Sequence, residues 1–178
     1  MMHKQLLLFV LLISFVQADL LIDLPDGTIR GYETTTENYT YYAYRGIPFA
    51  ISPLGNLRFE APVPRGPWDG ILDATEVKDC CISTSFSLSG PAQSEDCLYI
   101  NVYTSPRNIT KKLPVMFWIY GGGFTITDIF SGDPHPLVTE DDIVVTFNYR
   151  LGLYGFLSTN DIVILGNAGL KDQLLAMK

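Results

Sequence analysis

The feature of the sequence best suited to chemistry is a run of three glycines. Gly121, Gly122 and Gly123 directly follow the apolar stretch from Val115 to Tyr120. Because glycine has no side chain, consecutive backbone N–H groups can converge there on an anionic oxygen, which stabilises the tetrahedral intermediate of acyl transfer. A flexible turn or bulge is the alternative, since glycine runs often serve that purpose. The run lacks the further glycine of a dinucleotide-binding motif and the Gly-Lys-Ser/Thr of a phosphate loop.

The beginning of the chain predicts secretion. Leu6 to Val16 is almost entirely apolar, Lys4 precedes it and the small residue Ala18 follows it. This pattern is typical of a signal peptide, which we place at residues 1–18. The apolar run is too short to span a bilayer comfortably. We therefore expect residues 19–178 to be the mature, secreted part of the chain.

Secretion also decides how the three cysteines are interpreted. An oxidising compartment favours disulfides over metal thiolates. Adjacent cysteines rarely bridge each other, so either Cys80 or Cys81 is expected to pair with Cys97 and one thiol remains. No metal site is expected, because there is no second cysteine pair and His135 stands alone between two prolines.

Two glycosylation sequons fit the same compartment. They begin at Asn38 and Asn108, each in a polar stretch, and predict glycans at both positions. The composition excludes other classes of protein. With 12 Lys+Arg against 19 Asp+Glu the formal charge is −7, which argues against nucleic acid as a partner. An aromatic content of 12% excludes an acidic disordered tail.

Strands are the elements that must position the glycines. Two extended runs flank Pro25-Asp26-Gly27 and predict a hairpin. Further strands are predicted where Val, Ile, Phe and Tyr cluster: Tyr39–Tyr44, Leu98–Tyr103, Val115–Tyr120 and Ile143–Tyr149. The last two lack polar alternation, which indicates burial on both faces of a central sheet. The segment from Ile47 to Trp68 is rich in proline and is expected to wrap a surface without regular elements.

A helical pattern is predicted only at the end, from Leu170 to Lys178. Leu170, Leu174 and Met177 are spaced to share one face of that helix. A single short helix cannot cover both faces of a buried sheet. We therefore interpret the sequence as the N-terminal portion of a larger domain.

Five ordered segments resemble the type-B carboxylesterases, the cholinesterase-like branch of the α/β-hydrolases. The glycine run is one of them, and the others are spread over the mature chain: Gly46–Ala50 with Gly55–Phe59, Ser94–Val102, Asn148–Gly152 and Gly166–Gln173. The resemblance implies an α/β-hydrolase fold, here its N-terminal β-hairpin and the first strands of the central sheet. It also implies hydrolysis of a small-molecule carboxylic ester, without a cofactor.

The resemblance assigns roles to individual residues. Gly122 and Gly123 match the family's oxyanion-hole glycines. Cys97 matches the second cysteine of the first family disulfide, and Cys81 matches its partner better than Cys80 does. A structural ion pair is matched by two further residues, Arg58 and Glu95. We expect this pair to stabilise the scaffold and to take no part in acid–base catalysis.

The resemblance also implies which groups are absent. The family's mechanism needs a serine in Gly-x-Ser-x-Gly, then an acid and a histidine in that chain order. No Gly-x-Ser-x-Gly occurs, so no catalytic triad residue is expected within residues 1–178. Between Cys81 and Cys97 there is no tryptophan, and Phe86 is the only aromatic residue, which favours a general carboxylesterase over a choline-ester hydrolase. The alternative is a non-catalytic adhesion or signalling relative, because one fold carries several functions.

Overall fold

The computed structural model describes residues 20–35, 40–84, 92–106, 112–126, 137–139 and 141–178. The predicted signal peptide and both sequon asparagines, Asn38 and Asn108, lie outside these residues.

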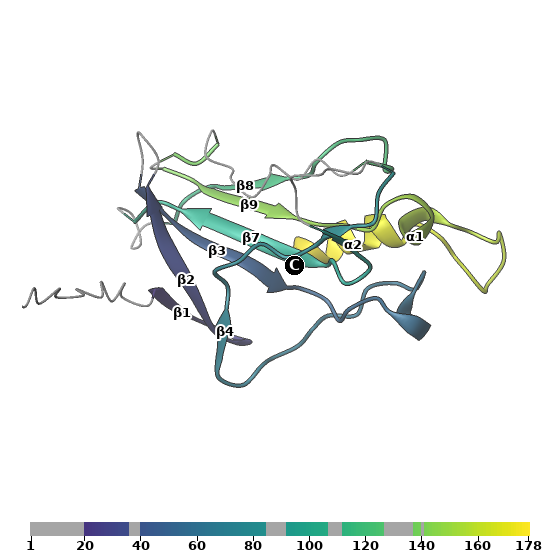
Figure 1. Ribbon diagram of the computed structural model, residues 1–178, viewed down its shortest axis with the longest axis horizontal. Helices are drawn as coiled ribbons and strands as arrows, with labels where there is room; N and C mark the ends of the chain where they lie inside the picture. Colours follow the sequence, from purple (N-terminus) through teal and green to yellow (C-terminus); the bar gives the residue numbers. More distant parts are fainter. Residues whose placement is uncertain (1–19, 36–39, 85–91, 107–111, 127–136, 140) are drawn as a thin grey trace, which may run out of the picture.

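A mixed sheet forms the body of the described chain (Figure 1). Its strands follow the order β1-β2-β3-β7-β9-β8, and β4 pairs with β2 away from this path. The strands are β1 (Leu20–Leu24), β2 (Gly27–Thr35), β3 (Thr40–Pro48), β4 (Ile71–Asp73), β7 (Tyr99–Thr104), β8 (Val115–Trp118) and β9 (Ile143–Phe147). A separate pair consists of β5 (Cys80–Cys81) and β6 (Gln93–Ser94).

The N-terminal hairpin is confirmed. β1 and β2 pair antiparallel from Leu20 opposite Gly31 to Leu24 opposite Gly27. The turn between them is covered by Trp68, whose backbone N–H donates to the Asp26 carbonyl at 2.8 Å. Trp68 ends the proline-rich segment that begins at Ile47. Apart from its first two residues, which belong to β3, this segment contains only a 3-10 turn, η1 (Gly55–Leu57).

The three central strands agree with the sequence in position but not entirely in burial. β9 pairs antiparallel with β7 and parallel with β8. It is largely buried, as expected from its apolar sequence. β8 is not buried: Val115 is 59% exposed and Met116 is 42% exposed. These side chains project from the two faces of the sheet, so their exposure shows that neither face of β8 is fully covered by the described residues.

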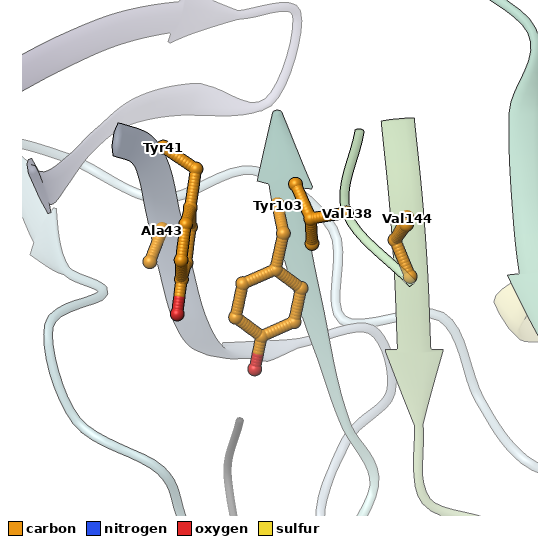
Figure 2. Packing of buried hydrophobic residues seen from close by; sticks show 5 residues of the cluster. All are labelled: Tyr41, Ala43, Tyr103, Val138 and Val144. Carbon is orange, nitrogen blue, oxygen red and sulfur yellow. The ribbon is translucent and has the colours of Figure 1, made fainter. Parts of the chain in front are cut away.

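An aromatic cluster holds β3, β7 and β9 together (Figure 2). Its buried members are Tyr41, Ala43, Tyr103, Val138 and Val144. The rings of Tyr41 and Tyr103 meet edge to face, with centroids 6.2 Å apart. Such pairs contribute about 0.5–1.5 kcal/mol beyond the area that they bury.

Two short helices lie at the end of the sheet where β9 terminates (Figure 1). The first, α1 (Gly152–Phe156), has no counterpart in the sequence-based prediction. The second, α2 (Ala168–Ala176), confirms the predicted helix with shifted ends. Its apolar residues do share a face, but that face is exposed, since Leu170, Leu174 and Met177 are 43–56% accessible. None of the described helices is long and apolar enough to cross a membrane.

Candidate functional site

Two tyrosines fix the point at which the glycine run begins. Tyr120 follows β8, Tyr149 follows β9, and both are buried. The Tyr149 hydroxyl donates to the Tyr120 carbonyl at 2.8 Å, and the Tyr120 hydroxyl donates to the Tyr149 carbonyl at 3.1 Å. Their rings stack with centroids 4.4 Å apart. Both backbone carbonyls beyond the strands are therefore satisfied, as buried polar groups must be.

The glycine run itself turns back toward the end of the sheet. The N–H groups of Thr125 and Ile126 both donate to the Gly122 carbonyl at 3.1 Å. Gly122 has φ +125° and Gly123 has φ +59°, values that strongly favour glycine. A methyl group on Gly122 would also overlap the Ile126 carbonyl. Gly122 is therefore required by both conformation and space, and Gly123 by conformation.

The N–H groups of Gly122 and Gly123 are available for a ligand within the described structure. Neither donates to another described group, and residues 121–126 are exposed. Both glycines follow β8 in the chain, and β8 and β9 are parallel, so their carboxyl ends lie at the same end of the sheet (Figure 1). Ligands of open α/β sheets bind at that end. The arrangement can thus present two backbone donors to an oxyanion.

Two contacts tie the glycine run to other parts of the chain. The Thr125 carbonyl accepts hydrogen bonds from the N–H of Thr84 at 2.9 Å and from its hydroxyl at 3.1 Å. The Phe124 carbonyl accepts from the N–H of Gly152, the first residue of α1, at 2.7 Å. The sequence-based analysis identified neither contact, because neither Thr84 nor Gly152 belongs to a pattern that predicts it.

The predicted disulfide joins Cys81 and Cys97, with an S–S distance of 2.01 Å. This confirms the pairing that the family resemblance favours. Cys80 stays a buried free thiol. Because successive side chains of a strand point to opposite faces, Cys80 in β5 is directed away from the bridge. Burial, and secondarily the Asp79 carboxylate, raises the pKa of the Cys80 thiol to about 11.

Arg58 and Glu95 form a two-pronged ion pair. The Arg58 Nε lies 2.5 Å from one Glu95 carboxylate oxygen, and its Nη2 lies 2.7 Å from the other. The hydrogen bond to Glu95, followed by its charge, raises the pKa of the Arg58 guanidinium. The pair lies beside the disulfide, and residues from both line a small cavity of about 10 Å³. It does not contact the glycine run, so the structure brings the predicted site residues together as two separate groups.

A second ion pair, absent from our sequence-based prediction, is buried. Asp172 of α2 accepts hydrogen bonds from Arg150 at Nε, Nη2 and the backbone N–H, at 2.7–3.0 Å. The exposed fractions of the two side chains are 4% and 0%. Nη2 of Arg150 also donates to the Glu60 carbonyl at 2.8 Å. One sequence signal could have indicated this pair: Asp172 is an acidic residue among the apolar residues of the predicted helix.

The described residues contain no group of three His, Cys, Asp or Glu side chains placed to hold a metal ion. A mixed sheet in which a glycine run with two available N–H groups follows a parallel strand fits the N-terminal part of an α/β-hydrolase.

Comparison with known proteins identifies the family. The model of the carboxylesterase family matches residues 18–178, so the chain belongs to the carboxylesterase family. It is 44% identical to venom carboxylesterase-6 of Apis mellifera and 43% identical to a juvenile hormone esterase of Tribolium castaneum, each over 85% of this chain. It is 40% identical to acetylcholinesterase 1 of Caenorhabditis elegans over 99% of this chain. The alignments cover only 26–31% of these relatives.

Proposed function

We propose that the full-length protein is a secreted carboxylic-ester hydrolase in which Gly122 and Gly123 donate to the oxyanion. One observation carries the proposal: both N–H groups are unused by the described residues at the carboxyl edge of β8 and β9. The names of the relatives, all esterases, support the same reaction.

The mechanism follows from what two backbone donors can do. A serine hydroxyl outside residues 1–178, activated by a histidine, attacks the ester carbonyl carbon and forms a tetrahedral intermediate. The negative charge moves to the former carbonyl oxygen, which accepts hydrogen bonds from Gly122 and Gly123. The intermediate then expels the alcohol and leaves an acyl-enzyme that water hydrolyses. Removing one oxyanion donor typically costs about 3–4 kcal/mol of transition-state stabilisation.

A matched pair of glycine variants tests this role. Gly123 (φ +59°) and Gly55 (φ +56°) have similar backbone conformations, and a methyl group on either would meet no atom within 4 Å. In the full-length protein, both Gly→Ala changes should therefore strain the fold equally. Only Gly123→Ala should lower kcat/KM for a short-chain aryl ester, by roughly 100-fold or more, because it displaces an oxyanion donor. Equal activity of the two variants would contradict the assignment.

The alternative is a non-catalytic adhesion or signalling protein. Labelling of the full-length wild-type protein with a reactive organophosphate separates the two functions, since it needs an activated serine. We expect stoichiometric labelling at a Gly-x-Ser-x-Gly serine beyond Lys178. Absence of both labelling and ester hydrolysis would favour the non-catalytic function.

We further propose that the substrate is a general carboxylic ester and not a choline ester. The support is the lack of tryptophan between Cys81 and Cys97, because cation binding prefers tryptophan to phenylalanine. The aromatic residue present there, Phe86, lies outside the described residues. A higher kcat/KM for an aryl butyrate than for butyrylthiocholine is expected. The reverse order would contradict this proposal.

Secretion and glycosylation belong to the same proposal. The apolar run of residues 6–16 and the disulfide support export into an oxidising compartment. In a eukaryotic host, the protein should appear in the medium with an N-terminus at Asp19, and glycosidase treatment should alter the peptides that contain Asn38 and Asn108. Retention in the cytosol with Met1 intact would contradict it.

A further inference from the structure

The residue that follows the glycine run is held by an aromatic contact from α1. Phe124 has φ +61°, a conformation that is unfavourable for a bulky residue and persists only when its surroundings hold it there. Its ring packs against the ring of Phe156, the last residue of α1, with centroids 4.7 Å apart. The hydrogen bond from the Gly152 N–H fixes the Phe124 carbonyl at the other end of α1. Phe124 is thus attached to α1 by both its side chain and its backbone.

The Phe156 ring also packs against α2. A methyl group on Gly169 of α2 would lie 2.8 Å from two ring carbons of Phe156, so the ring packs directly on the α2 backbone. α2 is in turn fixed by the buried Arg150–Asp172 pair. A continuous series of contacts therefore runs from a buried ion pair, through α2 and Phe156, to the residue next to Gly123.

We propose that Phe156 is a positioning residue of the oxyanion site. This inference rests on the esterase function proposed above. The Phe156 ring keeps Phe124 in its left-handed conformation and in its place. Because Phe124 is covalently joined to Gly123, a fixed Phe124 restricts the positions that the Gly123 N–H can take. Oxyanion donors act only when they are already aimed at the developing charge, and a displacement of about 1 Å can cost about 100-fold in rate. Phe156 needs no contact with substrate to exert this effect.

Leucine variants of the full-length protein test the contact from both sides. Phe156→Leu and Phe124→Leu keep an apolar side chain but remove the ring contact. Tyr154→Leu is the matched control, because Tyr154 belongs to the same helix but stacks on Phe59, with centroids 6.2 Å apart, away from the glycine run. Phe156→Tyr retains the ring and serves as the conservative variant. Unfolding temperature is measured for every variant to separate altered stability from altered turnover.

The expected result is a loss in kcat without a matching rise in KM. For a short-chain aryl ester, Phe156→Leu should lower kcat roughly 10- to 100-fold and change KM by less than about threefold. The inhibition constant of a trifluoromethyl ketone, whose adduct carries the oxyanion, should rise by the same factor as kcat/KM falls. Phe156→Tyr should remain close to wild type, and Tyr154→Leu should leave kcat unchanged. Phe124→Leu combined with Phe156→Leu should cost little more than either change alone.

Other outcomes would overturn the inference, and they differ from a failure of the proposed function. Unchanged kcat in Phe156→Leu, equal losses in Tyr154→Leu, or strictly multiplicative losses in the double variant would each exclude a positioning role while the wild type remains an esterase. A wild-type protein that hydrolyses no ester would overturn the proposed function and, with it, the role of Phe156.

Discussion

Tyr120 and Tyr149 satisfy each other's backbone carbonyls through their own hydroxyl groups. The reciprocal arrangement joins the ends of two parallel strands at the position where the glycine run begins. The Tyr149 backbone N–H also donates to the Tyr120 hydroxyl at 3.4 Å, and the two rings stack. The two tyrosine side chains thereby set the distance between the ends of β8 and β9. The glycine run, which has no side chains of its own, begins directly after Tyr120.

We expect Tyr149→Phe to destabilise the full-length protein. The change removes the 2.8 Å hydrogen bond to the buried Tyr120 carbonyl, and the loss of one such bond costs about 0.5–1.5 kcal/mol. Urea unfolding of the variant measures this loss. Tyr154→Phe is the control, because no described group is hydrogen-bonded to the Tyr154 hydroxyl. Equal stability of the two variants would argue against the reciprocal arrangement.

The two ion pairs should respond differently to neutralisation. Asp172→Asn leaves the Arg150 charge buried without a counter-charge, which should lower the free energy of unfolding by about 3–5 kcal/mol. Glu95→Gln should cost clearly less, because the Arg58 side chain is 41% exposed and water can solvate it. Chemical denaturation of both variants provides the comparison. A larger loss for Glu95→Gln would contradict the assigned burial.

Cys80 should resist alkylation in the folded protein. Its burial raises the thiol pKa to about 11, so at pH 8 only about one thiol in a thousand is ionised. Peptide mapping after iodoacetamide treatment should find Cys80 unmodified in native protein and modified in urea, without any reductant. Modification of native protein within minutes would show that the thiol is accessible.

Alkaline pH should destabilise the protein through its buried tyrosines. Burial, and secondarily Tyr42, raises the pKa of Tyr44 from 10.0 to about 12. Because the folded state favours the neutral phenol, this contribution is complete below pH 10 and is lost as the pH rises from 10 through 12. The Tyr44 hydroxyl has no described partner. Tyr44→Phe should therefore reduce the fall in unfolding temperature between pH 9 and 12, and at pH 7 its unfolding temperature should be no lower than that of the wild type. An unchanged pH profile would contradict this.

The sequence predicted the positions of the longer strands but not the short strands β4, β5 and β6. Val, Ile, Phe and Tyr cluster where β7, β8 and β9 lie, and turn residues bound the first hairpin, so local patterns were sufficient there. The exposure of β8 was not predictable from its composition, because it depends on which other segments cover the two faces of the strand. α1 is only five residues long and contains two glycines, too few to establish helical periodicity.

Side-chain partners distant in sequence were harder to predict. The cysteine pattern did not decide whether Cys80 or Cys81 pairs with Cys97. Only the family resemblance favoured Cys81, the residue that forms the bridge. The Arg150–Asp172 pair depends on how α2 lies against the end of β9, and no spacing rule gives that. The contact between Phe124 and Phe156 was equally unpredictable. Nothing in the sequence around either phenylalanine distinguishes it from others, and the two rings meet only because α1 lies beside the glycine run.

The order of the strands also bears on how the sheet assembles. β7 lies between β3 and β9, so Val102 pairs with Tyr44 on one side and with Val145 on the other. Both pairings join segments far apart in the chain. The entropy of closing the intervening loop is lost before the strand contacts form, so such topologies fold slowly. Oxidation of Cys81 and Cys97 shortens the stretch between β3 and β7. The bridge should therefore accelerate renaturation as well as raise stability, and reduced protein should refold slowly and expose its apolar strands for longer.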